Sequence, residues 1–257
     1  MSNTVLLSIE ENIATLTLNR PSSMNAMDIE LLNTLLTKLK EVKESDAKLL
    51  VITGEGKAFS AGGDIKTMLQ QADESGFHSV MNTIKEIIIT LYTMPLVTVS
   101  AVNGAAAGLG LSFALASDYV LADENAKLAM NFIGIGLIPD GGGHFFMKNR
   151  LGVEKAKKLI WQGQKLTATE AYKLGLIDDV LSGNFQDELK EKINLLSKHP
   201  LKAMVETKLI YTELHRPELE KVLEMETNGQ QKMRKTKDHQ EGMKAFMEKR
   251  TPNFIGE

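Results

Sequence analysis

The chain has 257 residues, which is enough for one large domain or two smaller ones around a sizeable core. Its formal net charge of −3 gives no bias toward nucleic acid or an acidic membrane surface as a partner. The sequence contains no cysteine, which excludes a disulfide framework, a thiol nucleophile and thiolate metal sites.

The N-terminal part of the sequence predicts a β-hairpin followed by a helix. Residues 5–9 and 13–18 are short, β-prone runs on either side of a polar tripeptide, a pattern typical of a hairpin. Leucines then recur at helical spacing from Leu31 to Leu39, and Asp28 stands where a helix N-cap is expected.

Buried strands alternate with loops and helices in the middle of the chain. Residues 49–53 and 96–102 are continuous apolar runs, and 118–122 is a third predicted strand after a small-residue helix at 110–116. This order of strand, loop and helix predicts an α/β fold. Polar residues and glycines interrupt the most apolar region, 96–116, so we expect a buried strand and helix there and no membrane span.

The last third of the chain has a different pattern. Thr167 and Glu170 form a capping box for a short helix, with Gly175 as its C-cap. Strand patterns end near residue 184, and amphipathic helices are predicted at 186–197, 201–214 and 217–233, with Pro200 and Pro217 suited to first-turn positions. We therefore predict an α/β core over residues 1–184 and a helical segment over residues 185–257.

Two glycine-rich stretches follow the apolar strands and are the most informative part of the sequence. They are KAFSAGGDIK at 57–66 and AVNGAAAGLGLS at 101–112. Small residues let a ligand approach the backbone closely and leave peptide N–H groups to point at it. Two such groups converging on one oxygen would form an oxyanion hole, which stabilises an enolate.

With four further motifs, these stretches make the sequence resemble the crotonase (enoyl-CoA hydratase/isomerase) family over nearly its whole length. The motifs are LNRP at 18–21, MNAM at 24–27, GLIPDGGG at 136–143 and EGMKAFMEKR at 241–250. The resemblance implies a superhelix of ββα turns, with C-terminal helices that pack against other subunits in a homotrimer or homohexamer. It also implies an acyl-CoA thioester as substrate, so CoA arrives with the substrate and no separate cofactor is expected.

The resemblance assigns the oxyanion hole to the N–H groups of Gly63 and Leu109. Leu109 lies between Gly108 and Gly110 at a predicted helix start, where N–H groups lack intrahelical partners and the helix dipole favours negative charge. The acyl-CoA substrate is then expected to contact Met24, Ala26, Ala61, Asp64, Ile65, Lys66, Gly108, Ser112, Phe132 and Lys249. The alternative is that these residues bind no ligand: the glycines would then form a tight turn and a closely packed helix, and the lysines would be solvated.

The family's hydratases carry two glutamates, and the matching positions here are Ser112 and Phe132. Hydration needs a base for the water and an acid for the α-carbon, and neither residue is suited to that task. Asp140 stands where isomerases of the family often carry their acid. One carboxylate can move a proton between the γ- and α-carbons, and an apolar lining from Phe132 and Ile133 would raise its pKa. The alternative for Asp140 is an ordinary turn or N-cap residue.

We therefore predict an acyl-CoA enzyme of fatty-acid or related metabolism that stabilises a thioester enolate. An enoyl-CoA isomerase with Asp140 as acid and base is favoured. One alternative is an enoyl-CoA hydratase that uses Asp140 or an ordered water in place of the glutamates. The other is a non-catalytic acyl-CoA-binding subunit.

The remaining expectations concern metals, His144 and location. No histidine pair has the spacing of a metal site, so no metal is expected. His144 could lie near the site as a proton shuttle, or it could be a helix-surface residue. The start of the chain lacks a signal-peptide pattern, and we expect a cytoplasmic protein with no membrane or nucleic-acid partner.

Overall fold

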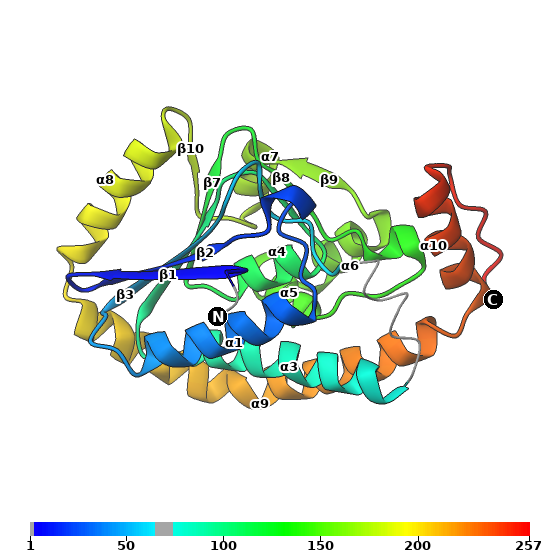
Figure 1. Ribbon diagram of the computed structural model, residues 1–257, viewed down its shortest axis with the longest axis horizontal. Coiled ribbons are helices and arrows are strands. Elements are labelled where there is room, and N and C mark those ends of the chain that lie inside the picture. The colour runs from blue at the N-terminus through cyan, green and yellow to red at the C-terminus, as the bar shows by residue number, and fades with distance from the viewer. Residues whose placement is uncertain (1–2, 65–73) are drawn as a thin grey trace.

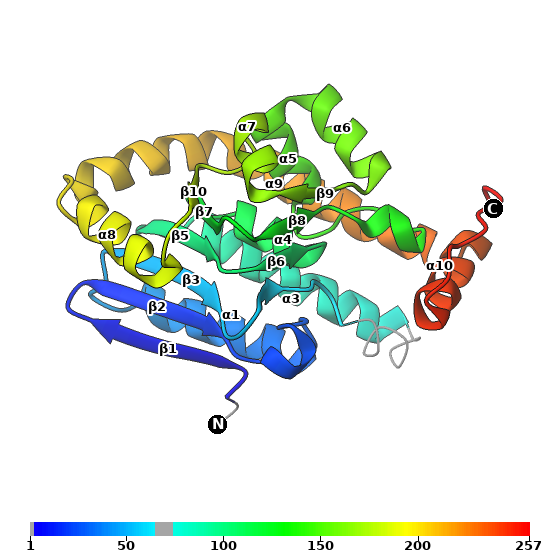
Figure 2. The ribbon, with the colours of Figure 1, turned by 90° about the horizontal axis from the view of Figure 1, so that it is seen from above.

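The computed structural model describes residues 3–64 and 74–257, and two β-sheets form its centre (Figures 1 and 2). The larger sheet has the strand order β1-β2-β3-β5-β7-β10 and the smaller one β4-β6-β8-β9. Within them, β1 pairs antiparallel with β2 and β8 antiparallel with β9, whereas the other pairs are parallel. The strands are β1 Val5–Glu10, β2 Ile13–Leu18, β3 Leu49–Gly54, β4 Ala58–Ser60, β5 Val97–Val102, β6 Ala105–Ala107, β7 Tyr119–Asp123, β8 Lys127–Ala129, β9 Lys165–Thr167 and β10 Asp179–Leu181.

The middle of the chain is built from repeated strand–strand–helix turns. In three successive turns, β3, β5 and β7 enter the large sheet, whereas β4, β6 and β8 enter the small one. Helices α3 (Glu74–Tyr92), α4 (Leu109–Leu115) and α5 (Gly143–Leu151) follow these strand pairs. Because each turn changes sheet after a short loop, the two glycine-rich stretches predicted above lie side by side where the strands end. The predicted α/β fold and its ββα turns are confirmed.

Helices cover both faces of the large sheet. On one side, α3 packs between α1 (Ile29–Lys43) and α9 (Leu201–Met233), as Figure 1 shows. On the other side, α8 (Phe185–Ser197) closes a smaller apolar cluster that includes Leu49, Val99 and Ile193. The other helices are α6 Val153–Gln162, α7 Ala168–Leu174, α10 Lys237–Glu248 and the 3-10 turns η1 Pro21–Ser23 and η2 Phe132–Ile135.

Several predicted local signals have the expected geometry. The Asp28 side chain accepts a hydrogen bond from the Leu31 N–H at 2.8 Å and caps α1. Thr167 and Glu170 form both hydrogen bonds of the capping box of α7, which ends at Gly175 in the left-handed conformation. After Leu181 the described chain is helical apart from turns and the C-terminal tail, so a C-terminal helical segment is present. The domain boundary at residue 184 stays a prediction.

The prediction of two helices at 201–214 and 217–233 is wrong. One continuous helix, α9, spans Leu201–Met233 with Pro217 inside it. Proline removes one intrahelical hydrogen bond and crowds the preceding turn, which costs about 3 kcal/mol in a helix interior. Pro217 lies on the exposed side, where water can bind the orphaned carbonyl, and buried Thr212 and Leu219 anchor the helix on both sides of it.

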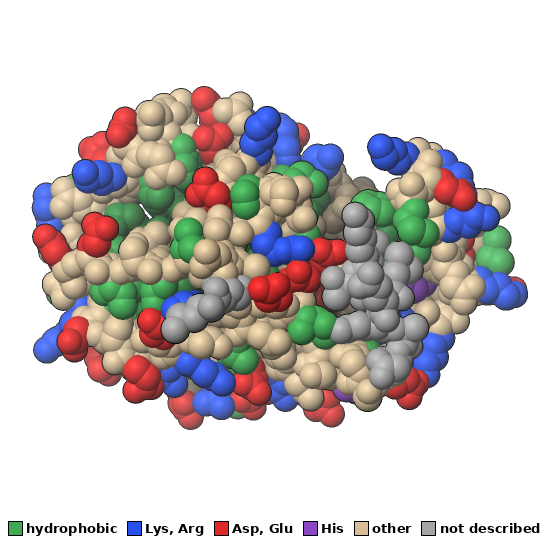
Figure 3. All heavy atoms as spheres, viewed as in Figure 1, with side chains coloured by type: hydrophobic (Ala, Val, Ile, Leu, Met, Phe, Trp, Pro, Cys, Tyr) green, Lys and Arg blue, Asp and Glu red, His purple; other side chains and the backbone are tan. Residues whose placement is uncertain are grey.

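The surface carries charges of both signs. Lys, Arg, Asp and Glu side chains are intermixed over the face shown in Figure 3, as the small net charge predicts. In the described part of the chain, no helix combines the length and the apolar character that crossing a membrane requires.

Candidate active site

The first glycine-rich loop is paired along its length with the N-terminal MNAM motif. The Ala61 N–H donates to the Met24 carbonyl at 2.9 Å, the Met27 N–H to the Gly62 carbonyl at 2.8 Å, and the Asp64 N–H to the Met27 carbonyl at 3.1 Å. This alternation leaves the Gly63 N–H without an acceptor among the described residues. Two segments far apart in sequence thus leave one backbone donor of the loop without an acceptor in the described structure.

The second loop places another backbone donor close by. Leu109 is the first residue of α4, so its N–H has no acceptor within the helix. Gly108 precedes it with φ 52° and ψ −125°, a conformation that favours glycine. A Cβ placed on Gly62 would lie 3.3 Å from the Leu109 nitrogen and 2.6 Å from the Ala107 carbonyl oxygen. The two loops are therefore in direct backbone contact, and only glycine fits at position 62.

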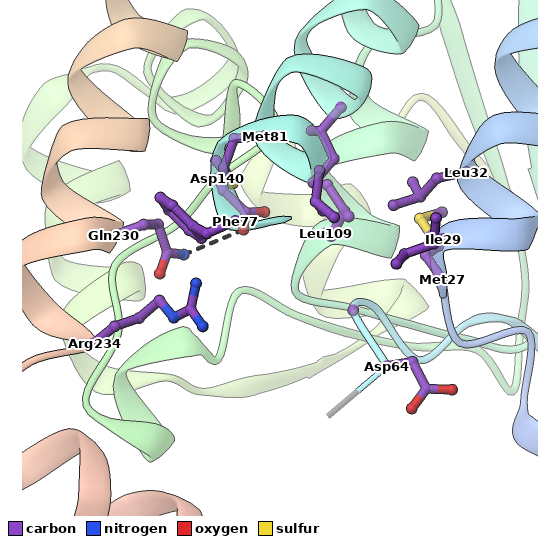
Figure 4. Close-up of a pocket in the computed structure, with 13 residues that line it drawn as sticks. Met27, Ile29, Leu32, Asp64, Phe77, Met81, Leu109, Asp140, Gln230 and Arg234 are labelled. Atoms are coloured by element: carbon purple, nitrogen blue, oxygen red, sulfur yellow. Dashed lines mark hydrogen bonds between the residues drawn. The ribbon is translucent and has the colours of Figure 1, made fainter. Parts of the chain in front are cut away.

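Two cavities meet at Gly63, Leu109 and Asp140. The first has a volume of about 70 Å³, and most of its walls are apolar side chains from the N-terminal end of α1 and from α3 (Figure 4). Its described lining is Met27, Ile29, Leu32, Gly63, Asp64, Phe77, Val80, Met81, Ile84, Leu109, Asp140, Gln230 and Arg234. The second has a volume of about 210 Å³, and its described lining is Ala61, Gly62, Gly63, Gly108, Leu109, Asn131, Phe132, Gly134, Ile135, Leu137, Asp140 and Phe246.

Asp140 is the carboxyl group at this junction. Its Oδ2 accepts a hydrogen bond from Gln230 Nε2 at 3.2 Å, whereas its Oδ1 is buried and has no hydrogen-bond partner in the described structure. Burial, and then the negative charge of Glu226, raise the pKa of Asp140 from 3.8 to about 8, against the lowering effect of the Gln230 hydrogen bond. A carboxyl group with such a pKa can both give and accept a proton near neutral pH.

Asp140 does not cap the following helix. The N-cap of α5 is Gly142, in the left-handed conformation, and glycine has no side chain that could accept a hydrogen bond from the first turn. Glu226, from α9, takes that role instead and accepts the Gly142 N–H at 2.7 Å and the His144 N–H at 3.0 Å. His144 Nδ1 also contacts Glu226 Oε1 at 2.8 Å, and its half-exposed ring lines neither cavity.

Sequence reasoning missed the contribution of α9 to the site. Glu226 and Gln230 are each 2% exposed, and Arg234 stacks its guanidinium 4.5 Å from the centre of the Phe77 ring. Burial also lowers the pKa of Arg234. A signal was present, because positions 219, 223, 226 and 230 follow helical spacing on one buried face that begins with two leucines. Polar residues that continue an apolar helix face indicate side chains that are buried and that form hydrogen bonds inside the protein.

The two positions that match the hydratase glutamates differ in their placement. Phe132 lines the second cavity and packs on Gly108, where an added Cβ would lie 3.5 Å from the ring. Ser112 is fully buried behind the loop, with its Oγ 3.5 Å from the Gly108 carbonyl oxygen and 3.7 Å from Met130 Sδ. Ser112 lines neither cavity, so the structure does not bring it to the site.

The residues predicted to contact CoA are dispersed. Ala61 and Gly108 line the second cavity, and Asp64 lines the first while it pairs with Arg20 at 3.2 Å. Three others lie outside both cavities: Met24 and Lys249 are exposed and Ala26 is half-buried. Ile65 and Lys66 lie outside the described residues. Phe246 of α10, which the sequence analysis did not single out, lines the second cavity.

The described residues include no cluster of three or more His, Asp or Glu side chains that could hold a metal ion.

Comparison with known proteins identifies the family. A sequence profile of the enoyl-CoA hydratase/isomerase family matches residues 8–257. YhaR of Bacillus subtilis, named for the same hydratase/isomerase group, is 49% identical over 242 residues, which cover 94% of this chain and 95% of YhaR. The 1,2-epoxyphenylacetyl-CoA isomerase of Escherichia coli is 32% identical over 263 residues and the whole of both chains.

A solved structure agrees with this assignment. The crystal structure of an enoyl-CoA hydratase from Mycobacterium avium subsp. paratuberculosis superimposes with a TM-score of 0.88 at 30% identity and covers 98% of each chain. The matched length, the identity and the ββα architecture agree, and this chain belongs to the crotonase family of enoyl-CoA hydratases and isomerases.

Proposed function

We propose that this protein is an enoyl-CoA isomerase in which Asp140 moves a proton along the acyl chain and the N–H groups of Gly63 and Leu109 hold the thioester oxygen. The observation that carries the proposal is the buried, unpartnered Oδ1 of Asp140 at the junction of the two cavities, which both backbone donors also border. A carboxyl oxygen without a partner at that place is available to a substrate.

The reaction needs one carboxylate and no water. With a 3-enoyl thioester, the Asp140 carboxylate takes a proton from the α-carbon, and the electron pair spreads over the conjugated system to the thioester oxygen. The two N–H groups stabilise this dienolate as an oxyanion hole. The carboxylic acid then returns the proton to the γ-carbon, and the double bond moves to the 2,3-position. The reverse reaction takes the γ-proton and returns it to the α-carbon.

The two cavities suit the two parts of an acyl-CoA. The mostly apolar first cavity, with Phe77 and Met81 in its wall, fits an acyl chain. The larger second cavity shares the same junction, and Ala61 and Phe246 are among its lining residues, which suits a pantetheine arm. A thioester at the junction would then present its carbonyl to Gly63 and Leu109.

A single acid also argues against the hydratase alternative. Asp140 and Asp64 are the carboxyl groups among the described lining residues, and Asp64 forms an ion pair with Arg20. Hydration needs a base for the water as well as an acid, and the matching positions are Phe132 and the buried Ser112. A non-catalytic binding subunit is a weaker candidate still, because burying a carboxyl group with one oxygen left unpartnered costs stability that binding alone does not require.

The test is proton NMR of a 3-enoyl-CoA in D2O with the wild type, Asp140→Asn and a control, Asp123→Asn. Asp123 is a half-buried aspartate that lines neither cavity. We expect conversion to the 2-enoyl thioester, a rate lower by at least about 100-fold in Asp140→Asn, and wild-type behaviour in the control.

Hydration of crotonyl-CoA, measured in parallel, separates the alternatives. Hydration that is faster than isomerisation would favour the hydratase. Tight binding of both thioesters, with neither conversion nor proton exchange, would favour the binding subunit. Either result would refute the proposal.

A further inference from the structure

Helix α9 reaches the turn that carries Asp140 with two buried polar side chains. Glu226 and Gln230 are one helical turn apart, so their side chains project from the same face toward residues 138–144. Both are 2% exposed, and a buried polar side chain needs partners to offset its lost hydration. Their partners are the groups immediately before and after Asp140.

Gln230 binds the turn on its N-terminal side, and Figure 4 shows its hydrogen bond to Asp140. Its Nε2 donates to the Ile138 carbonyl at 2.6 Å and to Asp140 Oδ2 at 3.2 Å. One amide group therefore fixes both the backbone before Asp140 and one oxygen of the carboxyl group. The other oxygen, Oδ1, has no hydrogen-bond partner in the described structure, and Asp140 lines both cavities.

Glu226 binds the turn on its C-terminal side. Its two oxygens accept three hydrogen bonds, from the Gly142 N–H, the His144 N–H and the His144 ring. The carboxylate thus occupies the N-terminus of α5, where the N–H groups and the helix dipole favour a negative charge. The same charge is buried close to Asp140.

We propose that Glu226 and Gln230 are positioning residues that hold the Asp140 carboxyl group in place and set its proton affinity in opposite directions. The proposal rests on the proposed function only in taking Asp140 as the acid and base. Glu226 places a fixed negative charge that favours protonated Asp140, whereas the Gln230 amide donates to the carboxylate and favours the ionised form. Together they keep the proton of Asp140 near balance at neutral pH.

Two other charged side chains line the first cavity together with Asp140. Asp64 and Arg234 line the same cavity, and His144 reaches Asp140 only through Glu226. Helices α3 and α4 contribute apolar side chains to the described lining of that cavity. Glu226 and Gln230 both act on Asp140 from α9. Replacing one of them leaves the other in place, so their opposite effects on Asp140 can be measured separately.

The test measures the titration of Asp140 directly in the full chain. Protein labelled with 13C at the aspartate carboxyl carbon gives a resonance for Asp140, identified by its absence in Asp140→Asn. The titration midpoint is then compared among the wild type, Glu226→Gln, Gln230→Met and the control Glu218→Gln. Glu218 is an exposed carboxylate on the same helix that pairs with Lys148.

We expect Glu226→Gln to lower the midpoint by about one pH unit and Gln230→Met to raise it, with Glu218→Gln at the wild-type value. A disturbed fold alone would shift both variants in the same direction, so shifts of one sign, or no shift, would overturn the proposal. If Glu226→Gln does not fold, the direction found for Gln230→Met decides alone.

The titration does not depend on turnover, so the two proposals fail separately. Opposite midpoint shifts with an isomerisation rate insensitive to Asp140→Asn would refute the function and keep the positioning roles. Loss of activity in Asp140→Asn without opposite midpoint shifts would keep the proposed function and refute the positioning roles.

Discussion

Replacing Asp140 by asparagine is expected to stabilise the fold at neutral pH even as it removes the proposed acid. Burial raises the pKa of Asp140 to about 8, so the folded protein holds this proton well above pH 3.8, the ordinary pKa of an aspartate. Between these two values the folded state binds one more proton than the unfolded state. The free energy of unfolding therefore falls as pH rises through this window and levels off above about pH 8.

The size of the effect follows from the width of the window. One proton changes the free energy of unfolding by about 1.4 kcal/mol per pH unit. The window of roughly four units then corresponds to a cost on the order of 5 kcal/mol above pH 8. Asparagine has the shape of the protonated acid and does not titrate, so Asp140→Asn avoids this cost.

Urea unfolding of both proteins at pH 5, 7 and 8.5 measures the difference. Asp140→Asn is expected to gain stability over the wild type as pH rises, by about 4 kcal/mol at pH 7 and by somewhat more at pH 8.5. If the two proteins lose or gain stability in parallel across this range, Asp140 does not hold a proton in the folded state, and the reasoning from its burial is refuted.

Three further predictions concern activity and the scaffold. The kcat/KM for a 3-enoyl-CoA should rise with pH until about pH 8, where Asp140 becomes ionised; a profile flat from pH 6 to 9 would contradict this. Gly62→Ala, at φ 93° and against the second loop, should lower kcat by about 100-fold or more, whereas Gly152→Ala, at φ 76° but with nothing within 4 Å of an added Cβ, should leave it near wild type. Lys208→Met breaks the 2.8 Å ion pair with Asp118 and should cost about 3 kcal/mol in denaturant unfolding; a loss below 1 kcal/mol would show that the pair is dispensable.

The sequence predicts the fold well because its signals are local. The hairpin, the continuous apolar strands and the caps at Asp28 and Thr167 each follow from residues within one element, and the structure contains all of them. Pro217 misled the prediction because the packing of α9 against the body of the protein overrides a local helix breaker. The sequence around the proline carries no local pattern that would reveal such tertiary contacts.

The candidate site could be predicted only in part. Gly63, Leu109 and Asp140 stand in motifs with a chemical reason, and the structure brings all three to one junction. Glu226 and Gln230 come from a helix more than 80 residues further along the chain, and their spacing to Asp140 carries no local pattern. Contacts between distant segments depend on how α9 crosses the protein, which composition and periodicity do not specify.

The length of α9 between its two points of attachment has a consequence for its evolution. Lys208 fastens the helix to the Leu96 carbonyl and Asp118, and Glu226 and Gln230 engage the active-site turn roughly 27 Å further along. Substitutions on the exposed side between these points leave the geometry intact. A single inserted or deleted residue there would rotate one end by about 100° relative to the other and turn both polar side chains away from Asp140. The exposed side of this stretch should therefore vary freely in composition among functional descendants of the chain, and the stretch should hardly vary in length.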